Sequence, residues 1–163
     1  LWRNGITSVL VTMSRKYLLF DIVGKDSKGC FVSVIWENRP VGDEGGLKNA
    51  LGYVNSDDVL VVNCDVITDL PISLLSPASS LVVVHPRSPW GVLQDDGSFV
   101  EKPILPIWVS AGIYMFPTSI ADELVTEGEI ARNIIPKLAG EGRLNVLRYE
   151  GKWRAVESTK EIK

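Results

Sequence analysis

Short apolar runs and segments of helical spacing alternate along the first half of the chain. Residues 6–13 and 30–36 are rich in β-branched side chains and predict strands. Apolar positions 18, 19, 22 and 23, and then 47, 50, 51 and 54, keep the spacing of one helix face. Residues 58–63 are almost wholly apolar, which is typical of a strand buried on both faces of a parallel sheet. This alternation predicts an α/β fold with a mainly parallel sheet.

The second half adds strands that favour antiparallel pairing. Helices are predicted over 119–125 and 129–138, the second broken or kinked at Pro136. Asp96-Gly97 predicts a hairpin turn. Strands are predicted at 81–84, 90–93, 98–100, 107–116, 144–149 and 152–156. We expect one α/β domain over residues 1–163, with a Rossmann-like mixed, mainly parallel sheet flanked by helices.

Composition narrows the class of protein. The 163 residues are 45% hydrophobic and 23% charged, which suits a globular domain with a core. A formal charge of −3, with Lys and Arg scattered, argues against a nucleic-acid partner. No apolar run approaches the roughly 20 residues that cross a bilayer, and no signal-peptide pattern is present, so no membrane partner is expected. Cys30 and Cys64 lie in apolar runs and predict two buried free thiols in a reducing compartment, so a cytoplasmic location is expected.

Polar residues that follow apolar strands are the first candidates for chemistry, because ligands of α/β sheets bind at the carboxyl ends of strands. Asp65 follows the predicted buried strand and suits Mg²⁺ bound to phosphate oxygens, although it could equally cap a turn with Asp69. Gly45 and Gly46, at the expected start of a helix near one of them, would let a nucleotide approach free N–H groups, although turn glycines are the commoner case.

Two further candidates differ in strength. Glu101 and Lys102, held by Pro103 after a strand, suit sugar hydroxyls and a phosphate, with a solvated surface pair as the simpler interpretation. His85 lies outside any catalytic or metal-ligand pattern and is interpreted as a turn residue. The glycines and lysines of residues 24–29 follow no strand, so a turn is favoured there over a phosphate loop.

Taken in order, these features resemble the sugar-phosphate nucleotidylyltransferases over nearly the whole chain. Residues 39–50 look like the nucleotide loop and helix of that family, and residues 60–65 with Thr68 and Asp69 are similar to its strand ending in a metal-binding aspartate. Trp90-Gly91-Val92 resembles the aromatic-glycine turn over the sugar. Further family landmarks match at residues 100–103, 110–116, 135–138 and 149–159.

The resemblance implies a site and also shows departures from it. It implies nucleotide binding at Gly45 and Gly46 and Mg²⁺ binding at Asp65. It implies sugar-phosphate binding at Gly91, Glu101, Lys102, Ser110 and Gly112. Asp43 and Glu44 stand where the family usually has threonine and alanine, and would bring negative charge toward an anionic ligand. Cys64 and Ser110 replace a glycine and an asparagine.

Two departures bear on activity. Ala155 replaces the expected second metal aspartate and Glu157 a glycine, so Mg²⁺ binding should be weak. The chain begins at Leu1, with residues 1–5 resembling the last turn of a helix, and the family's first strand and its glycine-rich loop with Arg and Lys have no counterpart. We therefore expect an N-terminally truncated domain whose catalytic residues are unknown.

The implied function belongs to nucleotide-sugar biosynthesis. The family transfers a nucleotidyl group from a nucleoside triphosphate to a sugar 1-phosphate, releases pyrophosphate, and relies on positioning, Mg²⁺ and cationic groups. The isolated chain is expected to release no pyrophosphate. The alternative is a non-catalytic sugar-nucleotide-binding or regulatory relative. Expected partners are a nucleoside triphosphate and a sugar 1-phosphate, with a homo-oligomer or a complementing N-terminal segment filling the place of the first strand.

Overall fold

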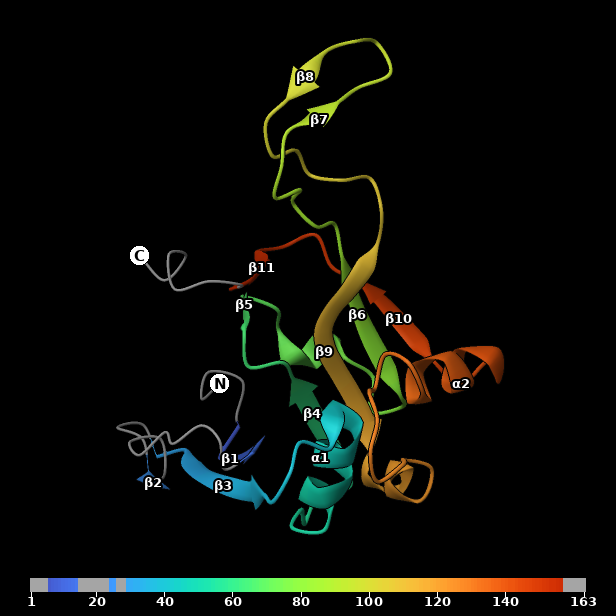
Figure 1. Cartoon of the computed structure of the whole chain (residues 1–163). Coiled ribbons are helices and arrows are strands. Elements are labelled where there is room, and N and C mark those ends of the chain that lie inside the picture. Colours follow the sequence, from blue (N-terminus) through green and yellow to red (C-terminus); the bar gives the residue numbers. More distant parts are fainter. Residues whose placement is uncertain (1–5, 15–23, 26–28, 157–163) are drawn as a thin grey trace.

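The computed structural model describes residues 6–14, 24–25 and 29–156. The predicted helix at residues 18–23 lies outside these ranges. Figure 1 shows a central sheet with helices to one side and a long hairpin that projects from one end. The strands are β1 (Ser8–Ser14), β2 (Gly24–Lys25), β3 (Phe31–Glu37), β4 (Asp58–Val62), β5 (Val66–Thr68), β6 (Ser80–Val84), β7 (Val92–Leu93), β8 (Phe99–Val100), β9 (Val109–Pro117), β10 (Asn145–Arg148) and β11 (Trp153–Ala155).

Four strands form the central sheet in the order β10-β6-β9-β4. β10 pairs with β6 in parallel, whereas β9 runs antiparallel to both β6 and β4. Three of the four strands therefore point the same way, and the α/β class predicted from the sequence is confirmed. β4 is an edge strand among the described residues, is only partly buried and pairs antiparallel with β9. The prediction that residues 58–63 form a strand buried on both faces of a parallel sheet is therefore wrong.

Three smaller sheets complete the described topology. β1 and β3 pair in parallel, with β2 on the other side of β3. β5 pairs with β11, and β7 with β8, both antiparallel. The predicted hairpin is confirmed, because the Asp96 carboxylate accepts hydrogen bonds from the backbone and hydroxyl of Ser98 and Gly97 has a φ of 83°. Residues 144–149 and 152–156 do form strands, but β10 and β11 join different sheets.

Side-chain alternation along the central sheet builds two apolar layers. On β9, Tyr114 and Phe116 pack under the helices, whereas Ala111 and Ile113 face the other layer. The helical face is covered by α1 (Gly42–Leu51), the 3₁₀ helix η3 (Thr118–Asp122) and α2 (Ile134–Gly140). The opposite layer contains Leu70 and Leu75, which flank the 3₁₀ helix η2 (Ile72–Leu74). No described helix is long and apolar enough to span a membrane.

Several local predictions need correction. The predicted helix at 119–125 is only the short 3₁₀ helix η3 (Thr118–Asp122), and residues 129–133 precede α2, which begins at Ile134. Pro136 thus lies in the first turn of α2, where its missing N–H would have no intrahelical partner, so it does not break the helix. Cys30 is buried as predicted, but Cys64 is exposed because it lies in the turn after the edge strand β4.

Candidate functional site

The carboxyl ends of β4, β6 and β10 meet at one edge of the central sheet, together with the beginning of β9. The residues that follow or begin these strands are Asn63 to Asp65, His85, Tyr149 and Ser110. In an open α/β sheet this is the edge where ligands bind. The structure thus brings Asp65, Ser110 and Gly112 to the same edge, although they are widely spaced in the sequence.

Asp65 and Ala155 are neighbours across a strand pair. Ala155 lies opposite Val66 in the β5–β11 ladder, and the Val156 N–H donates to the Asp65 carbonyl oxygen at 2.8 Å. The Asp65 side chain is exposed, and its carboxylate has no hydrogen-bond or ion-pair partner in the described part of the chain. No cluster of three or more His, Cys, Asp or Glu suited to a metal occurs among the described residues. The geometry therefore offers a metal ion one carboxylate, where an aspartate at position 155 would add a second.

A small polar network holds β11 in this position, and sequence inspection had not identified it. The Tyr149 hydroxyl and the Lys152 N–H both donate to Asp69 Oδ1, the latter at 2.8 Å. The Thr68 hydroxyl donates to the Lys152 carbonyl at 2.9 Å. The Tyr149 hydrogen bond lowers the pKa of Asp69, and the same bond raises the pKa of Tyr149 to about 12. Asp69 is thus a positioning residue for the strand that carries Ala155.

Ser110 and Gly112 form a turn-like irregularity near the start of β9, where its pairing register with β6 shifts. Gly112 has a φ of 68°, and a β-carbon at that position would lie 2.8 Å from the Asn63 side-chain nitrogen. The Gly112 N–H donates to the Ser110 hydroxyl oxygen at 3.2 Å, and the Asn63 N–H donates to the Gly112 carbonyl at 2.8 Å. These bonds tie the Ser110 turn to the chain two residues before Asp65. The glycine landmark therefore marks a close approach of two strands.

Gly91, Glu101 and Lys102 lie at the base of the β7–β8 hairpin. A β-carbon on Gly91 would lie 2.1 Å from the Phe99 ring and 2.9 Å from Glu101 Oε2, so Gly91 and Glu101 are adjacent. Lys102 has a φ of 48°, and its carbonyl accepts a hydrogen bond of 2.8 Å from Arg87. The hairpin projects away from the body of the molecule (Figure 1). No described contact joins these three residues to Asp65.

Gly45 and Gly46 lie inside α1, which begins at Gly42, so the helix expected to start near them begins three residues before Gly45. Both are buried. A β-carbon on Gly45 would lie 2.6 Å from the Thr126 carbonyl oxygen, and one on Gly46 would lie 2.9 Å from both Thr12 Oγ1 and Glu37 Oε1. Close packing accounts for these glycines. Burial raises the pKa of Glu37, whose Oε1 has no hydrogen-bond partner within the described ranges.

Asp43 and Glu44 both accept hydrogen bonds from within the chain. The buried Glu44 carboxylate accepts hydrogen bonds from the Val125 N–H and the Asn133 side-chain amide. Asp43 Oδ1 accepts one from the Ile130 N–H at 2.8 Å. Both acids tie the start of α1 to the segment before α2. The backbone N–H groups of that segment have no strand partner among the described residues, so the two carboxylates accept their hydrogen bonds. Glu44 is therefore turned into the chain, contrary to the sequence interpretation, whereas Asp43 is exposed and binds the Ile130 N–H through one oxygen.

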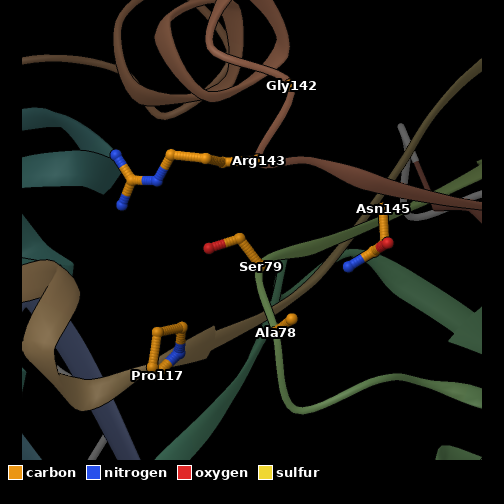
Figure 2. A pocket seen from close by; sticks show the side chains of 6 residues that line it. All are labelled: Ala78, Ser79, Pro117, Gly142, Arg143 and Asn145. Atoms are coloured by element: carbon orange, nitrogen blue, oxygen red, sulfur yellow. The ribbon is translucent and has the colours of Figure 1, made fainter.

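The hollow shown in Figure 2 lies at the other end of the sheet. Its lining consists of Ala78, Ser79, Pro117, Gly142, Arg143 and Asn145. These residues precede β6 and β10 or end β9, and so lie opposite the carboxyl edge. The Arg143 guanidinium is already paired with Glu123 and Glu141, both at 2.6 Å. This hollow does not coincide with any residue predicted to bind ligand.

Comparison with known proteins agrees with this geometry. No protein-family profile matches the chain. Mannose-1-phosphate guanyltransferase beta-B from Xenopus laevis is 27% identical over 98% of this chain and 51% of its own length. Mannose-1-phosphate guanylyltransferase from Mycobacterium tuberculosis is 25% identical over 89% of this chain and 46% of its own length. The chain thus spans about half the length of the curated relatives that it matches.

Solved structures with the same fold have more distant sequences. HddC from Yersinia pseudotuberculosis superposes with a TM-score of 0.74 at 20% identity, covering 99% of this chain and 78% of HddC, and it has also been solved with GMP-PN. The inositol-1-phosphate CTP transferase from T. maritima gives 0.66 at 14% identity, covering 99% and 75%. The fold is that of the sugar-phosphate nucleotidyltransferases, and the resemblance predicted from the sequence is confirmed. The two curated relatives to which the chain is similar are both named as mannose-1-phosphate guanyl- or guanylyltransferases.

Proposed function

We propose that this chain carries the fold of a sugar-1-phosphate nucleotidylyltransferase, which transfers a nucleotidyl group from a nucleoside triphosphate to a sugar 1-phosphate and releases pyrophosphate. The proposal rests on the carboxyl edge of the central sheet, where Asp65, Ser110 and Gly112 meet. The names of the relatives make a guanine nucleotide and mannose 1-phosphate the first substrates to test.

Each predicted site residue receives a role within this proposal. Asp65 would hold Mg²⁺ between phosphate oxygens, weakly, because Ala155 provides no second carboxylate. Ser110, Gly112 and Lys102 would bind the sugar phosphate, while Gly91 and Glu101 on the hairpin would contact the sugar. Gly45 and Gly46 are packed against other segments, so we place the nucleotide beside them, at the carboxyl end of the β1–β3 pair where Thr12 and Glu37 lie. With Asp65 as its one carboxylate ligand, the site suits a single, weakly held Mg²⁺ ion.

Chemistry at such a site consists mainly of positioning. The sugar phosphate oxygen attacks the α-phosphorus in line and pyrophosphate leaves, with no covalent intermediate on the protein. Mg²⁺, when bound, supplies charge neutralisation at the phosphates. Backbone and hydroxyl groups at the start of β9 would orient the sugar phosphate, and Asp69 would keep β11 in register beside Asp65.

The same proposal includes a strand partner. Within the described residues, β1 pairs only with β3 and β4 only with β9, so the two strands have unpaired edges and share no sheet. Unpaired strand edges favour pairing with another segment. We propose that a complementing N-terminal segment or a second copy of the chain pairs there, and that its pairing completes the site. Sedimentation of the purified chain with and without such a peptide tests this point.

Ligand-observed NMR with GDP-mannose, GTP and mannose 1-phosphate tests the proposed function directly. We expect GDP-mannose to bind, and Asp65→Asn to weaken that binding only when Mg²⁺ or Mn²⁺ is present. Asp57→Asn is the matched control, because Asp57 is exposed at the opposite end of β4. A chain that binds none of the three ligands would contradict the proposal. Binding that is indifferent to metal would instead favour the non-catalytic relative, in which Ala155 ended metal-dependent transfer.

A further inference from the structure

Three side chains outside the predicted site share the carboxyl edge of the central sheet. His85 follows β6, Trp108 precedes β9 and Arg148 ends β10. Arg148 lies opposite Val83, and Val83 lies opposite Ser110. Arg148, Val83 and Ser110 therefore form one row across the sheet. Residues directly opposite each other point to the same face, and two strand spacings separate Arg148 from Ser110 by roughly 10 Å.

The face is set by alternation along β10. Leu147 and Tyr149 pack against the apolar layer that contains Val82 and Val84. Arg148 therefore points to the other face, away from the hydrogen bond between Tyr149 and Asp69. The sheet thus separates the Arg148 guanidinium from the Asp69 carboxylate.

Arg148 is held by an aromatic ring, and its hydrogen-bonding capacity is unused. Its guanidinium carbon lies 5.7 Å from the centre of the Trp108 ring. In the part of the chain that the structure describes, Arg148 is exposed and makes no ion pair or side-chain hydrogen bond. A cation–π contact uses the face of the guanidinium and leaves its N–H donors in the plane. Arg148 can therefore present a fork of donors to an anion.

His85 packs against the same tryptophan. The two ring centroids are 3.9 Å apart with an interplanar angle of 36°. Nδ1 of His85 lies 3.1 Å from the Leu105 carbonyl oxygen and 2.9 Å from that of Ile107. Because both partners are acceptors, Nδ1 must carry a hydrogen and donate it. Nε2 is the nitrogen left for a ligand, since no residue of the described ranges contacts it through a hydrogen bond.

We propose that Arg148, His85 and Trp108 form a binding site for the phosphoryl group of a phosphate monoester. The Arg148 fork would bind two phosphate oxygens, and His85 Nε2 would meet a third oxygen or its proton. Trp108 would hold both groups in place. The Ser110 hydroxyl, in the same row, would bind the remainder of the ligand. The identity of the ligand as a sugar phosphate rests on the proposed function, whereas the phosphoryl site itself rests on these contacts alone.

His85 is the only histidine in the sequence, so its imidazole Hε1 proton gives one unambiguous NMR signal. Inorganic phosphate titrated at constant ionic strength should shift this signal saturably in the wild-type chain. Arg148→Gln should weaken the apparent phosphate affinity at least about tenfold, since it removes charge-assisted hydrogen bonds. Arg132→Gln should leave the affinity unchanged, because Arg132 is exposed and pairs only with Glu129 among the described residues. Arg148→Lys should retain part of the binding.

Mannose 1-phosphate and GDP-mannose, titrated in the same way, separate the two proposals. An Arg148-dependent phosphate shift without binding of either sugar ligand would support the phosphoryl site and contradict the proposed function. If GDP-mannose binds but phosphate does not shift the His85 signal, the proposed function is supported and the phosphoryl site is overturned. Equal phosphate shifts in the wild type and in Arg148→Gln would also overturn it.

Discussion

Glu44 and Asn133, 89 residues apart in the sequence, are joined by a hydrogen bond of 2.8 Å from the Asn133 amide to Glu44 Oε2. The other oxygen of the same carboxylate accepts from the Val125 N–H at 3.1 Å. Arg39 and Glu127 form an ion pair beside this contact. The start of α1 and the segment before α2 therefore behave as one unit, which fixes α1 over the helical face of the sheet.

Glu44→Ala should destabilise the chain by about 2–4 kcal/mol, because Glu44 is 1% exposed and the change removes two hydrogen bonds to a charged acceptor. Glu150→Ala is the matched control, since Glu150 is exposed in the turn before β11, and should change stability by less than about 0.5 kcal/mol. Urea unfolding measures both. Equal unfolding midpoints for the two variants would contradict the role assigned to Glu44.

Gly42→Ala should be destabilising by more than about 1 kcal/mol. Gly42 has a φ of 78°, and a β-carbon there would lie 2.0 Å from the Gly128 carbonyl oxygen. Gly52→Ala provides the control, because Gly52 has a helical φ of −63° and its nearest neighbour would lie at 3.5 Å. That change should be neutral or stabilising by up to about 1 kcal/mol. Thermal unfolding of the two variants gives the comparison, and a stable Gly42→Ala chain would rule out the close contact with Gly128.

Ala155→Asp should strengthen Mn²⁺ binding in the presence of nucleotide by at least about tenfold. A second carboxylate about 4 Å from a divalent ion is worth about 2 kcal/mol even in water. The gain should disappear when Asp65→Ala is added, because the two carboxylates would act on one ion. Isothermal titration calorimetry measures each step. If Ala155→Asp strengthened Mn²⁺ binding equally with and without Asp65→Ala, these two positions would not share a metal ion.

Asp69 should make stability depend on pH in the acid range. Its pKa is lowered in the folded chain, first by the Tyr149 hydrogen bond, so its ionised form stabilises the fold above the unfolded value of about 4. That contribution is lost as the pH falls through the folded value. The difference in Tm between the wild type and Asp69→Asn should therefore be constant from pH 5 to 9 and shrink toward pH 2. A difference of the same size at pH 2 and pH 7 would contradict this linkage.

Tyr149 should make stability depend on pH in the alkaline range, because its pKa is raised to about 12 by the hydrogen bond with Asp69. Its contribution is present below the unfolded value of about 10 and is lost as the pH rises through the folded value. Tyr149→Phe should remove this alkaline loss and, like Asp69→Asn, reduce the acid dependence. Absorbance at 295 nm follows the ionisation, which should move to lower pH in Asp69→Asn. If Tyr149 ionised at the same pH in Asp69→Asn as in the wild type, Asp69 would not be the cause of its raised pKa.

Strands and the hairpin could be predicted because they depend on local pattern. The apolar runs of β1, β3, β6 and β9 and the Asp96-Gly97 turn occur where alternation and turn chemistry placed them. Helix boundaries were less predictable. Gly42 begins α1 because its positive φ and its contact with Gly128 are possible only for glycine, and that contact is made across the chain. The composition of the β4 run predicts a strand buried on both faces, yet its position at the edge depends on which strand pairs with it.

The sequence alone determined the α/β class, because apolar periodicity records it, and it pointed to Asp65 because that residue follows an apolar strand. Ser110 and Gly112 became candidates only through the resemblance to the family. Only the tertiary structure decided that Asp43 and Glu44 bind the backbone before α2, that Gly45 and Gly46 are packing glycines, and that Arg148 lies over Trp108. These contacts join residues from 9 positions apart, for Gly46 and Glu37, to 89 positions apart, for Glu44 and Asn133. A carboxylate or guanidinium has the same local signature whether a backbone donor, an aromatic ring or a ligand meets it, so the partner is set by the fold.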